Sequence, residues 1–190
     1  MGLRYTATRV RRAVVISTAV ALALASSGCA LLPGRSMAKD IGQLNVTSPE
    51  LREGKPLPRE YSCKGNQGSP PLRWSGEPLP GAKSIAIVLD THTGANPAVN
   101  WVVYNIPPDW TELGPNATEA LPDDDSGQAK VTSGKEGYEP PCDDKATYRF
   151  SVYALDEPVT VEGGASLPKV LKNIADRTIA RGRLTVVHIE

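Results

Sequence analysis

The sequence predicts a mainly β protein: a β-sandwich with long loops and one C-terminal helix followed by a final strand. Three observations lead to this prediction. Several short runs are dominated by Val, Ile, Tyr and Trp, which favour strands. The segments between these runs are long and rich in Pro, Gly and Asp, notably residues 107–146. A single segment near the C-terminus places its apolar residues at helical spacing.

Six runs are expected to be strands, and two of them indicate where the core lies. Every residue from Ile85 to Leu89 is apolar. In residues 148–155 the side chains of one face, which include Phe150, alternate with those of the other face, which include Arg149. Such strands are covered on both faces of a sheet. The expected strands are Gln43–Thr47, Leu72–Ser75, Ser84–Asp90, Val99–Ile106, Thr147–Leu155 and Arg183–Ile189.

The helix is expected from Leu167 to about Thr178. Ser166 is a suitable N-cap residue, and Pro168 suits the first turn, where no backbone N–H is needed. The pair Arg181-Gly182 is expected to end this segment before the last strand begins.

The first 28 residues have the layout of an export signal: four arginines, an apolar run from Ala13 to Ala25, then small residues. This run of 13 residues is shorter than the about 20 that a helix needs to span a bilayer. We therefore expect residues 1–28 to be a cleaved signal peptide, residues 29–43 to be a polar tether that begins with Cys29, and residues 44–190 to be the folded domain. The pair Arg11-Arg12 leaves twin-arginine export open.

Cys29 follows Ser26-Ser27-Gly28, and this arrangement resembles the bacterial lipobox, in which the cysteine receives lipid and becomes the new N-terminus. Ser26 stands where the lipobox usually has Leu. The expected location is therefore the outer face of the cell membrane, as a lipoprotein held there only by its N-terminal lipid. The alternative is ordinary cleavage, which would leave an unmodified thiol on a secreted protein.

The charge balance argues against nucleic acid as a partner. Loss of residues 1–28 removes four arginines and no acids from a chain with 21 of each, which leaves 162 residues with a formal charge of −4. Nucleic-acid binding depends on Lys and Arg that neutralise phosphates, and no basic cluster remains. A chain of this length suits one domain with its own core.

Residues 61–74 follow neither a helical nor a strand period. Gly65 and Gly68 permit backbone angles that other residues resist, the pair Pro70-Pro71 prevents a helix, and Leu72 with Trp74 restarts a period of two. The segment is therefore expected to be a shaped loop that leads into a strand. It resembles the signature of the phosphatidylethanolamine-binding protein (PEBP) family, in its bacterial Raf-kinase-inhibitor-like branch, where Tyr-Thr-Cys-Asp-Gly precedes Ser-Pro-Pro-Leu-x-Trp.

The resemblance continues from about Leu44 to the C-terminus and implies a PEBP-like β-sandwich. It also implies an anion pocket at the edge of the sandwich, where imidazoles and hydroxyls donate hydrogen bonds to oxyanion oxygens and a carboxylate orients the donors. The further motifs, in the family's order, are Lys83–Asp90, Asn100–Pro107, Gly137-Tyr138 with Pro141-Cys142, and Tyr148–Asp156.

This chain departs from the family's pocket motifs. Asp90 matches the first aspartate of Asp-Pro-Asp-x-Pro, but His92 replaces the second. Asn100 and Tyr148 stand at the positions of the two family histidines, while Pro141 is kept. We expect these five residues to form a modified ligand site in which Asp90 accepts a hydrogen bond from His92 or Tyr148. The alternative is that His92 faces solvent and the pocket has degenerated.

Three cysteines are present, and Cys29 belongs to the leader. In an exported, oxidising setting the other two, Cys63 and Cys142, are expected to pair. Both lie in family motifs, and the resemblance places both loops near the ligand pocket. The alternative is two reduced, buried thiols, because sequence spacing alone cannot establish proximity.

Catalysis is not expected, because the chain has no Gly-x-Ser-x-Gly or His-Glu-x-x-His motif. Its two histidines, His92 and His188, are separated by most of the domain, and His188 is interpreted as structural. The run Asp123-Asp124-Asp125 is interpreted as a solvated turn, since a calcium site needs more oxygen ligands at regular spacing. No metal and no cofactor are expected.

The leading hypothesis is a non-enzymatic, extracytoplasmic lipoprotein. It would bind a small anionic or polar, phosphate-like ligand, or an extracytoplasmic protein, through loops 90–100 and 138–148. The kinase inhibition in the branch name does not transfer, because an exported domain would not meet a cytoplasmic kinase. The alternative function is inhibition of a serine protease or another partner by a domain with a degenerate pocket.

Overall fold

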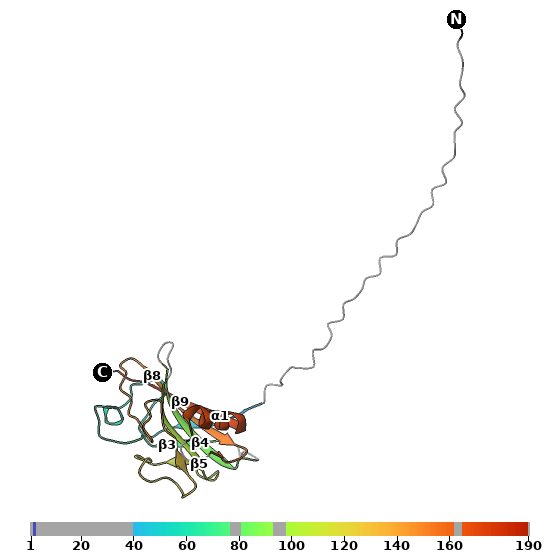
Figure 1. Cartoon of the computed structure of the whole chain (residues 1–190). Helices are drawn as coiled ribbons and strands as arrows, with labels where there is room; N and C mark the ends of the chain where they lie inside the picture. Colours follow the sequence, from blue (N-terminus) through green and yellow to red (C-terminus); the bar gives the residue numbers. More distant parts are fainter. Residues whose placement is uncertain (1, 3–39, 77–80, 93–97, 162–164, 190) are drawn as a thin grey trace. The chain divides into compact units, whose positions relative to one another are not determined.

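The computed structural model describes residues 2, 40–76, 81–92, 98–161 and 165–189 (Figure 1). Apart from Gly2, the expected signal peptide lies outside them, and so do Cys29 and residues 30–39 of the tether. The described residues confirm a mainly β fold in two sheets, with one helix before the last strand.

The larger sheet is built around a central antiparallel strand. Its strands, in spatial order, are β1 (Gly42–Gln43), β9 (Thr178–Val187), β8 (Thr147–Leu155), β4 (Ser84–His92), β5 (Ala98–Ile106) and β7 (Gly127–Gln128). β4 pairs antiparallel with both β5 and β8. Its apolar run is covered on both faces, as expected: Ile87 and Leu89 belong to one core cluster, and Ala86 and Val88 belong to the other.

The smaller sheet contains β2 (Asn45–Thr47), β3 (Leu72–Ser75) and β6 (Glu112–Leu113), in that order. It packs on one face of the larger sheet around a core that includes Trp74, Trp101 and Phe150. The strand expected over Gln43–Thr47 is in fact two strands in different sheets. Residues of β1 pair in parallel with β9, whereas β2 pairs antiparallel with β3. The last residues of the expected tether therefore belong to the fold.

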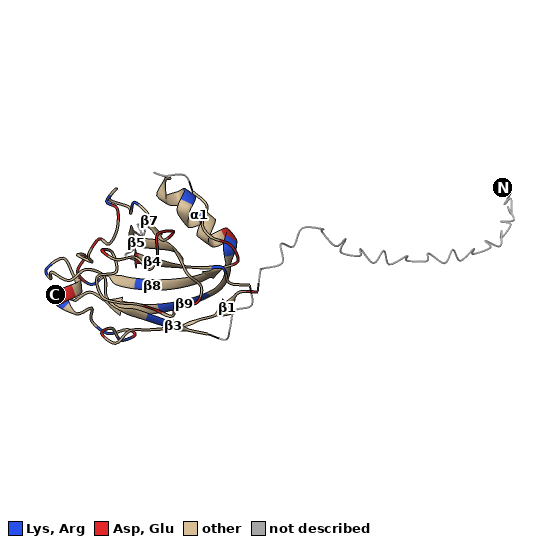
Figure 2. Cartoon of the chain, turned by 90° about the horizontal axis from the view of Figure 1, so that it is seen from below, with Lys and Arg blue, Asp and Glu red and all other residues tan. Residues whose placement is uncertain are grey.

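The helix α1 (Leu167–Arg177) covers the opposite face of the larger sheet, so that the domain has three layers (Figure 2). Val170 and Ile174 are buried there against Leu155. Ser166 is the N-cap residue and Pro168 lies in the first turn, as predicted, although the Ser166 side chain makes no capping hydrogen bond.

The predicted start of the final strand at Arg183 is wrong, because β9 begins at Thr178, directly after the helix. The Thr178 hydroxyl donates to the carbonyl oxygen of Ile174 at 2.7 Å and closes the last turn. Gly182 is not part of a turn but lies inside β9, where a Cβ atom would overlap the carbonyl oxygen of Leu44. This glycine allows the segment between β1 and β2 to pass close to β9.

The shaped loop expected over residues 61–74 is present and follows a short 3-10 helix, η1 (Arg59–Tyr61). The expectation that Gly65 and Gly68 adopt backbone angles that other residues resist is wrong, since neither has a positive φ. A Cβ atom on Gly65 would overlap the backbone of Glu60, and one on Gly68 would overlap the side chain of Asn116. Close packing, and not an unusual backbone angle, therefore explains both residues.

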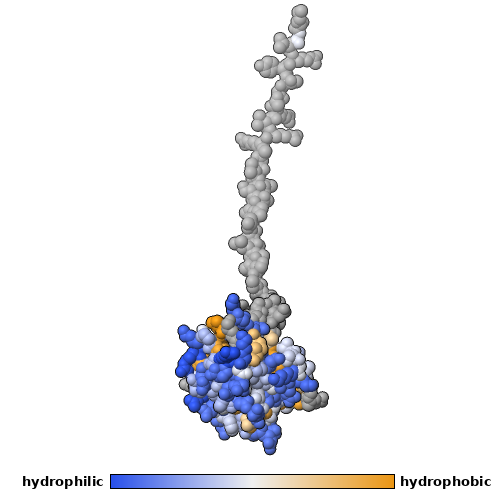
Figure 3. Space-filling model, turned by 90° about the vertical axis from the view of Figure 1, so that its left-hand side faces the viewer, coloured by the Kyte–Doolittle hydropathy of each residue, from blue (hydrophilic) through white to orange (hydrophobic). Residues whose placement is uncertain are grey.

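The face of the folded domain seen in Figure 3 is mostly hydrophilic, with apolar side chains gathered in small patches. Among the described residues, no helix is long and apolar enough to cross a membrane.

Candidate functional site

Asp90, the aspartate expected in the ligand site, is bound by an arginine. The antiparallel register of β4 and β8 places Asp90 directly opposite Arg149. The Arg149 Nε donates to Asp90 Oδ2 at 3.0 Å, and Arg149 Nη2 forms a second contact with the same oxygen. This hydrogen bonding raises the pKa of the guanidinium, against a smaller lowering by burial. The expectation that Asp90 accepts from Tyr148 is therefore wrong, because opposed residues of neighbouring strands share one face of the sheet.

Tyr148 lies on the face of the sheet opposite to this ion pair, and both Tyr148 and Asn100 are held by hydrogen bonds within the protein. Tyr148 is buried opposite Thr91, and its hydroxyl accepts from the backbone N–H of Asp143 at 3.0 Å. The Thr91 hydroxyl donates to Asn100 Oδ1. Asn100 Nδ2 reaches the carbonyl oxygen of Glu139 at 3.5 Å. Burial raises the pKa of the Tyr148 phenol, and the hydrogen bond from Asp143 opposes this rise. Both side chains that replace the family histidines are neutral donors and acceptors.

His92 is placed only in part. Its backbone ends β4 opposite Thr147, but its side chain lies outside what the structure describes, and so do residues 93–97 of the loop that follows. The role expected for His92 therefore stays a prediction.

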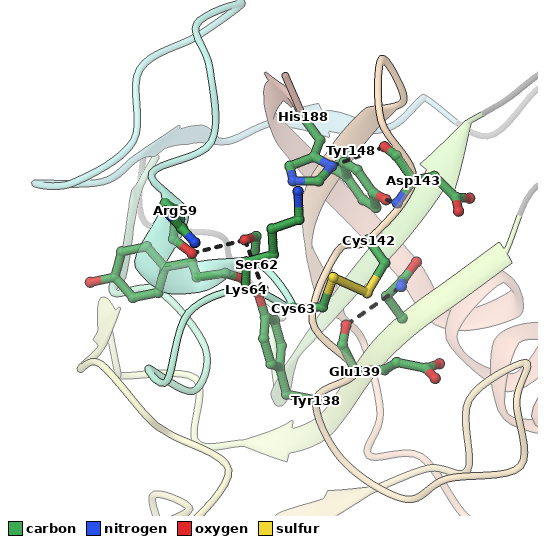
Figure 4. The surroundings of a disulfide bond; sticks show 12 residues. Arg59, Ser62, Cys63, Lys64, Tyr138, Glu139, Cys142, Asp143, Tyr148 and His188 are labelled. Carbon is green, nitrogen blue, oxygen red and sulfur yellow. Dashed lines mark hydrogen bonds between the residues drawn. A yellow bond between two sulfur atoms is a disulfide. The ribbon is translucent and has the colours of Figure 1, made fainter. Parts of the chain in front are cut away.

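The predicted disulfide between Cys63 and Cys142 is confirmed, with Cα atoms 5.3 Å apart (Figure 4). The backbone N–H of Cys63 also donates to the carbonyl oxygen of Pro141 at 2.9 Å. Close by, the Tyr138 hydroxyl donates to the carbonyl oxygen of Tyr61 at 2.9 Å. The shaped loop is thus joined to residues 138–142 by the disulfide and by these two hydrogen bonds.

His188, interpreted from the sequence as structural, lies near the disulfide (Figure 4). It is buried, its Nδ1 lies 3.1 Å from the carbonyl oxygen of Asp143, and its ring packs edge to face on Tyr148. In Figure 4 the Lys64 side chain extends toward the His188 ring. We call Lys64, Pro141, Asp143, Tyr148 and His188 the disulfide-linked surface. No local pattern links His188, beyond the end of β9, to a loop more than a hundred residues earlier.

A cavity of about 310 Å³ opens beside the disulfide-linked surface and is lined by Leu57, Arg59, Lys64 and Ile189. The described lining residues carry two cations and no carboxylate. Sequence reasoning missed Arg59 and Lys64. Arg59, in η1, lies outside the family motifs, and Lys64 lies inside the Cys63 motif at a position where the family has Asp, so neither was recognised as a ligand contact. Among the described residues, no three His, Cys, Asp or Glu side chains gather closely enough to hold a metal ion.

Comparison with known proteins agrees with the fold and the motifs. The sequence model described as "Phosphatidylethanolamine-binding protein" matches residues 47–189. A UPF0098 protein of Methanothermobacter thermautotrophicus is 36% identical over 147 residues, which cover 74% of this chain and 95% of that protein. A Mycobacterium tuberculosis protein with the name "Putative lipoprotein LppC" is 31% identical over 147 residues, which cover 74% of this chain and 70% of LppC.

Two solved structures have the same fold. The PEBP homologue CT736 of Chlamydia trachomatis has a TM-score of 0.68 at 29% identity, with 78% of this chain and 99% of CT736 covered. YbcL of E. coli, described as a new member of the mammalian PEBP family, has a TM-score of 0.70 at 27% identity, with 77% of this chain and 98% of YbcL covered.

Proposed function

The chain belongs to the phosphatidylethanolamine-binding protein family, and from this premise we propose that it is an exported, non-catalytic binding protein that holds a small anion beside its disulfide-linked surface. The observation that carries the proposal is the cavity of about 310 Å³ lined by Arg59 and Lys64. Its volume suits a small molecule, and its two cations would attract a phosphate or carboxylate group. Leu57 and Ile189 offer apolar contact to the rest of such a ligand.

The charges around the disulfide-linked surface favour this cavity over the position of the missing histidines. Asn100 and Tyr148 can donate hydrogen bonds but carry no positive charge near neutral pH. Arg149 is engaged with Asp90, so neither of these two charges is available as a separate ligand contact. Asp143 adds a negative charge beside Tyr148. The described lining of the cavity has two cations, Arg59 and Lys64, and no carboxylate, so it is the more favourable place for an anion.

Calorimetric titration with inorganic phosphate and with phosphoethanolamine tests the proposal. We expect saturable binding that weakens about tenfold in Arg59→Gln and in Lys64→Gln, because each substitution removes a charge-assisted contact. Bound anion should also raise the unfolding temperature, since it binds only the native state. The matched control is Lys169→Gln, which removes an exposed cation on α1. If neither probe binds, or if Lys169→Gln weakens binding as much as Lys64→Gln, the assigned cavity is wrong.

We further propose that Cys29 carries lipid and holds the domain at the outer face of the cell membrane. The similarity to LppC, a lipoprotein by name, supports this proposal. Mass spectrometry of the mature N-terminus should show a lipidated Cys29, and the Cys29→Ala protein should leave the membrane fraction. An unmodified mature N-terminus would contradict the proposal.

A further inference from the structure

A second cavity, of about 430 Å³, lies at the other end of β4. Its lining includes Lys83 and Ser84, at the start of β4, together with Asn105 and Asp123. Asp90 follows Ser84 by six residues along the strand, so the two ends are separated by roughly 20 Å. Its described lining shares no residue with the cavity at Arg59 and Lys64, so it is separate from the proposed anion site.

Ser84 gives this cavity an unusual feature. The residue is 2% exposed, and its buried Oγ has no hydrogen-bond partner among the described residues. Because side chains alternate along a strand, Ser84 faces the same side of the sheet as Ala86 and Val88. Val159, which also lines the cavity, packs in that same cluster. Buried hydroxyls in native proteins are usually paired, and a ligand in the cavity would supply the missing partner.

The walls of the cavity are held in place by hydrogen bonds. Asn105, with φ of 60°, accepts through Oδ1 from the backbone N–H of Val159 at 2.7 Å and donates through Nδ2 to its carbonyl oxygen at 3.2 Å. The Ser126 hydroxyl donates to the carbonyl oxygen of Asn105 at 3.0 Å. Asn105 thus joins the end of β5 both to the segment before α1 and to the turn at Asp123.

The turn at residues 123–125, expected from the sequence to be solvated, supplies negative charge to the lining of the cavity. Asp123 Oδ1 accepts from the backbone N–H groups of Asp125 and Ser126, at 2.8 and 3.1 Å, which orients its carboxylate. Asp123 and Asp125 both line the cavity, whereas the described lining has one cation, Lys83. The net charge of the described lining is therefore negative, opposite to that of the cavity at Arg59 and Lys64.

We propose that this cavity binds the primary ammonium group of a small amine or amino acid. Asp123 and Asp125 accept hydrogen bonds from the ammonium N–H groups, and the buried Ser84 hydroxyl supplies a further acceptor. If the ligand is an amino acid, the ammonium group of Lys83 binds its carboxylate.

Calorimetric titration of the purified protein with n-propylamine, γ-aminobutyrate and tetramethylammonium tests the proposal. At least one of the first two should bind saturably, and tetramethylammonium should not, because it has no N–H to donate. Preference for γ-aminobutyrate that is lost in Lys83→Gln would identify amino acids as the ligand class. Preference for n-propylamine would identify amines.

Two pairs of variants separate a site from general charge attraction. Asp125→Asn should weaken binding about tenfold, whereas Asp124→Asn, the same change at a neighbour outside the lining, should leave it unchanged. Ser84→Ala should weaken binding without lowering the unfolding temperature of the free protein, since the hydroxyl has no partner to lose. Absence of binding to both probes, equal effects of the two aspartate variants, or full affinity in Ser84→Ala would overturn the proposal.

Discussion

Removing the disulfide between Cys63 and Cys142 should lower the free energy of unfolding substantially. The two residues are 79 positions apart, and in the chain-entropy model closing such a loop stabilises the native state by about 4.5 kcal/mol at 25 °C. The cause lies in the unfolded chain, which gains freedom without the bridge. The native loops retain other contacts, including the hydrogen bond from Cys63 to Pro141 at 2.9 Å.

Urea unfolding of the oxidised protein, of the reduced protein and of the Cys63→Ser/Cys142→Ser variant would measure this loss. The reduced protein and the variant should agree, and a reductant should not affect the variant. The denaturant slope should rise when the bridge is absent, because the unfolded chain exposes more surface. In thermal unfolding, a loss of this size corresponds to a fall of about 9–18 °C for a chain of this length.

Two results would refute the reasoning. A loss below about 1 kcal/mol would mean that the unfolded chain stays compact near these residues without the bridge, so that closing the loop restricts it little. A loss of the expected size with an unchanged denaturant slope would place the effect in the native state instead. The chain-entropy account would then be wrong for this protein.

Two further substitutions test packing and hydrogen bonding. Gly182→Ala should lower the free energy of unfolding by about 1–3 kcal/mol, because the new methyl would overlap the backbone of Leu44. The control Gly114→Ala, which has nothing within 4 Å of the new methyl, should leave it nearly unchanged in the same urea assay. Equal effects of the two substitutions would contradict the close approach of Leu44 to Gly182. Tyr138→Phe should cost about 1–2 kcal/mol through loss of the hydrogen bond to Tyr61. Burial raises the pKa of Tyr138. Above about pH 10 the unfolded state therefore binds fewer protons than the native state, and the free energy of unfolding falls with rising pH. The contribution of this group to the fall is about 1.4 kcal/mol for each pH unit. Unfolding measured from pH 9 to 12 should show a shallower fall in the Phe variant, and equal slopes would exclude Tyr138 as a source of the fall.

Local patterns were sufficient where a residue's neighbours in sequence determine its structure. The strands Leu72–Ser75 and Thr147–Leu155 have the predicted bounds, and α1 differs from its prediction by one residue. The alternation of side chains and the helical spacing of apolar residues are properties of consecutive residues, so they can be read without the partner strand. The family motifs added the loop that contains Cys63, and the cysteine count together with the expected export predicted its pairing with Cys142, which no spacing rule could supply.

The candidate site was predictable only in its parts. Asp90, Asn100 and Tyr148 were identified by motif position, but only Asn100 and Tyr148 gather around Thr91, whereas Asp90 faces the other side of the sheet with Arg149, so the prediction that Tyr148 donates to Asp90 was wrong. The observed partner of Asp90 is Arg149, which directly follows Tyr148 in the sequence. Which of two adjacent residues faces Asp90 depends on strand register, and a shift by one residue exchanges the faces of a strand.

By itself, the sequence determined the fold class, the positions of most strands and the helix, and the two cysteines that pair. Tertiary structure decided how these pieces meet: that Gly42–Gln43 and Asn45–Thr47 enter different sheets, that Gly182 lies within β9, and that Arg59 and Lys64 line one cavity while Ser84, Asp123 and Asp125 line another. The physical reason is that sheet pairing and cavity lining depend on contacts between residues far apart in the chain. Such contacts leave no period in the sequence, whereas strands and helices do.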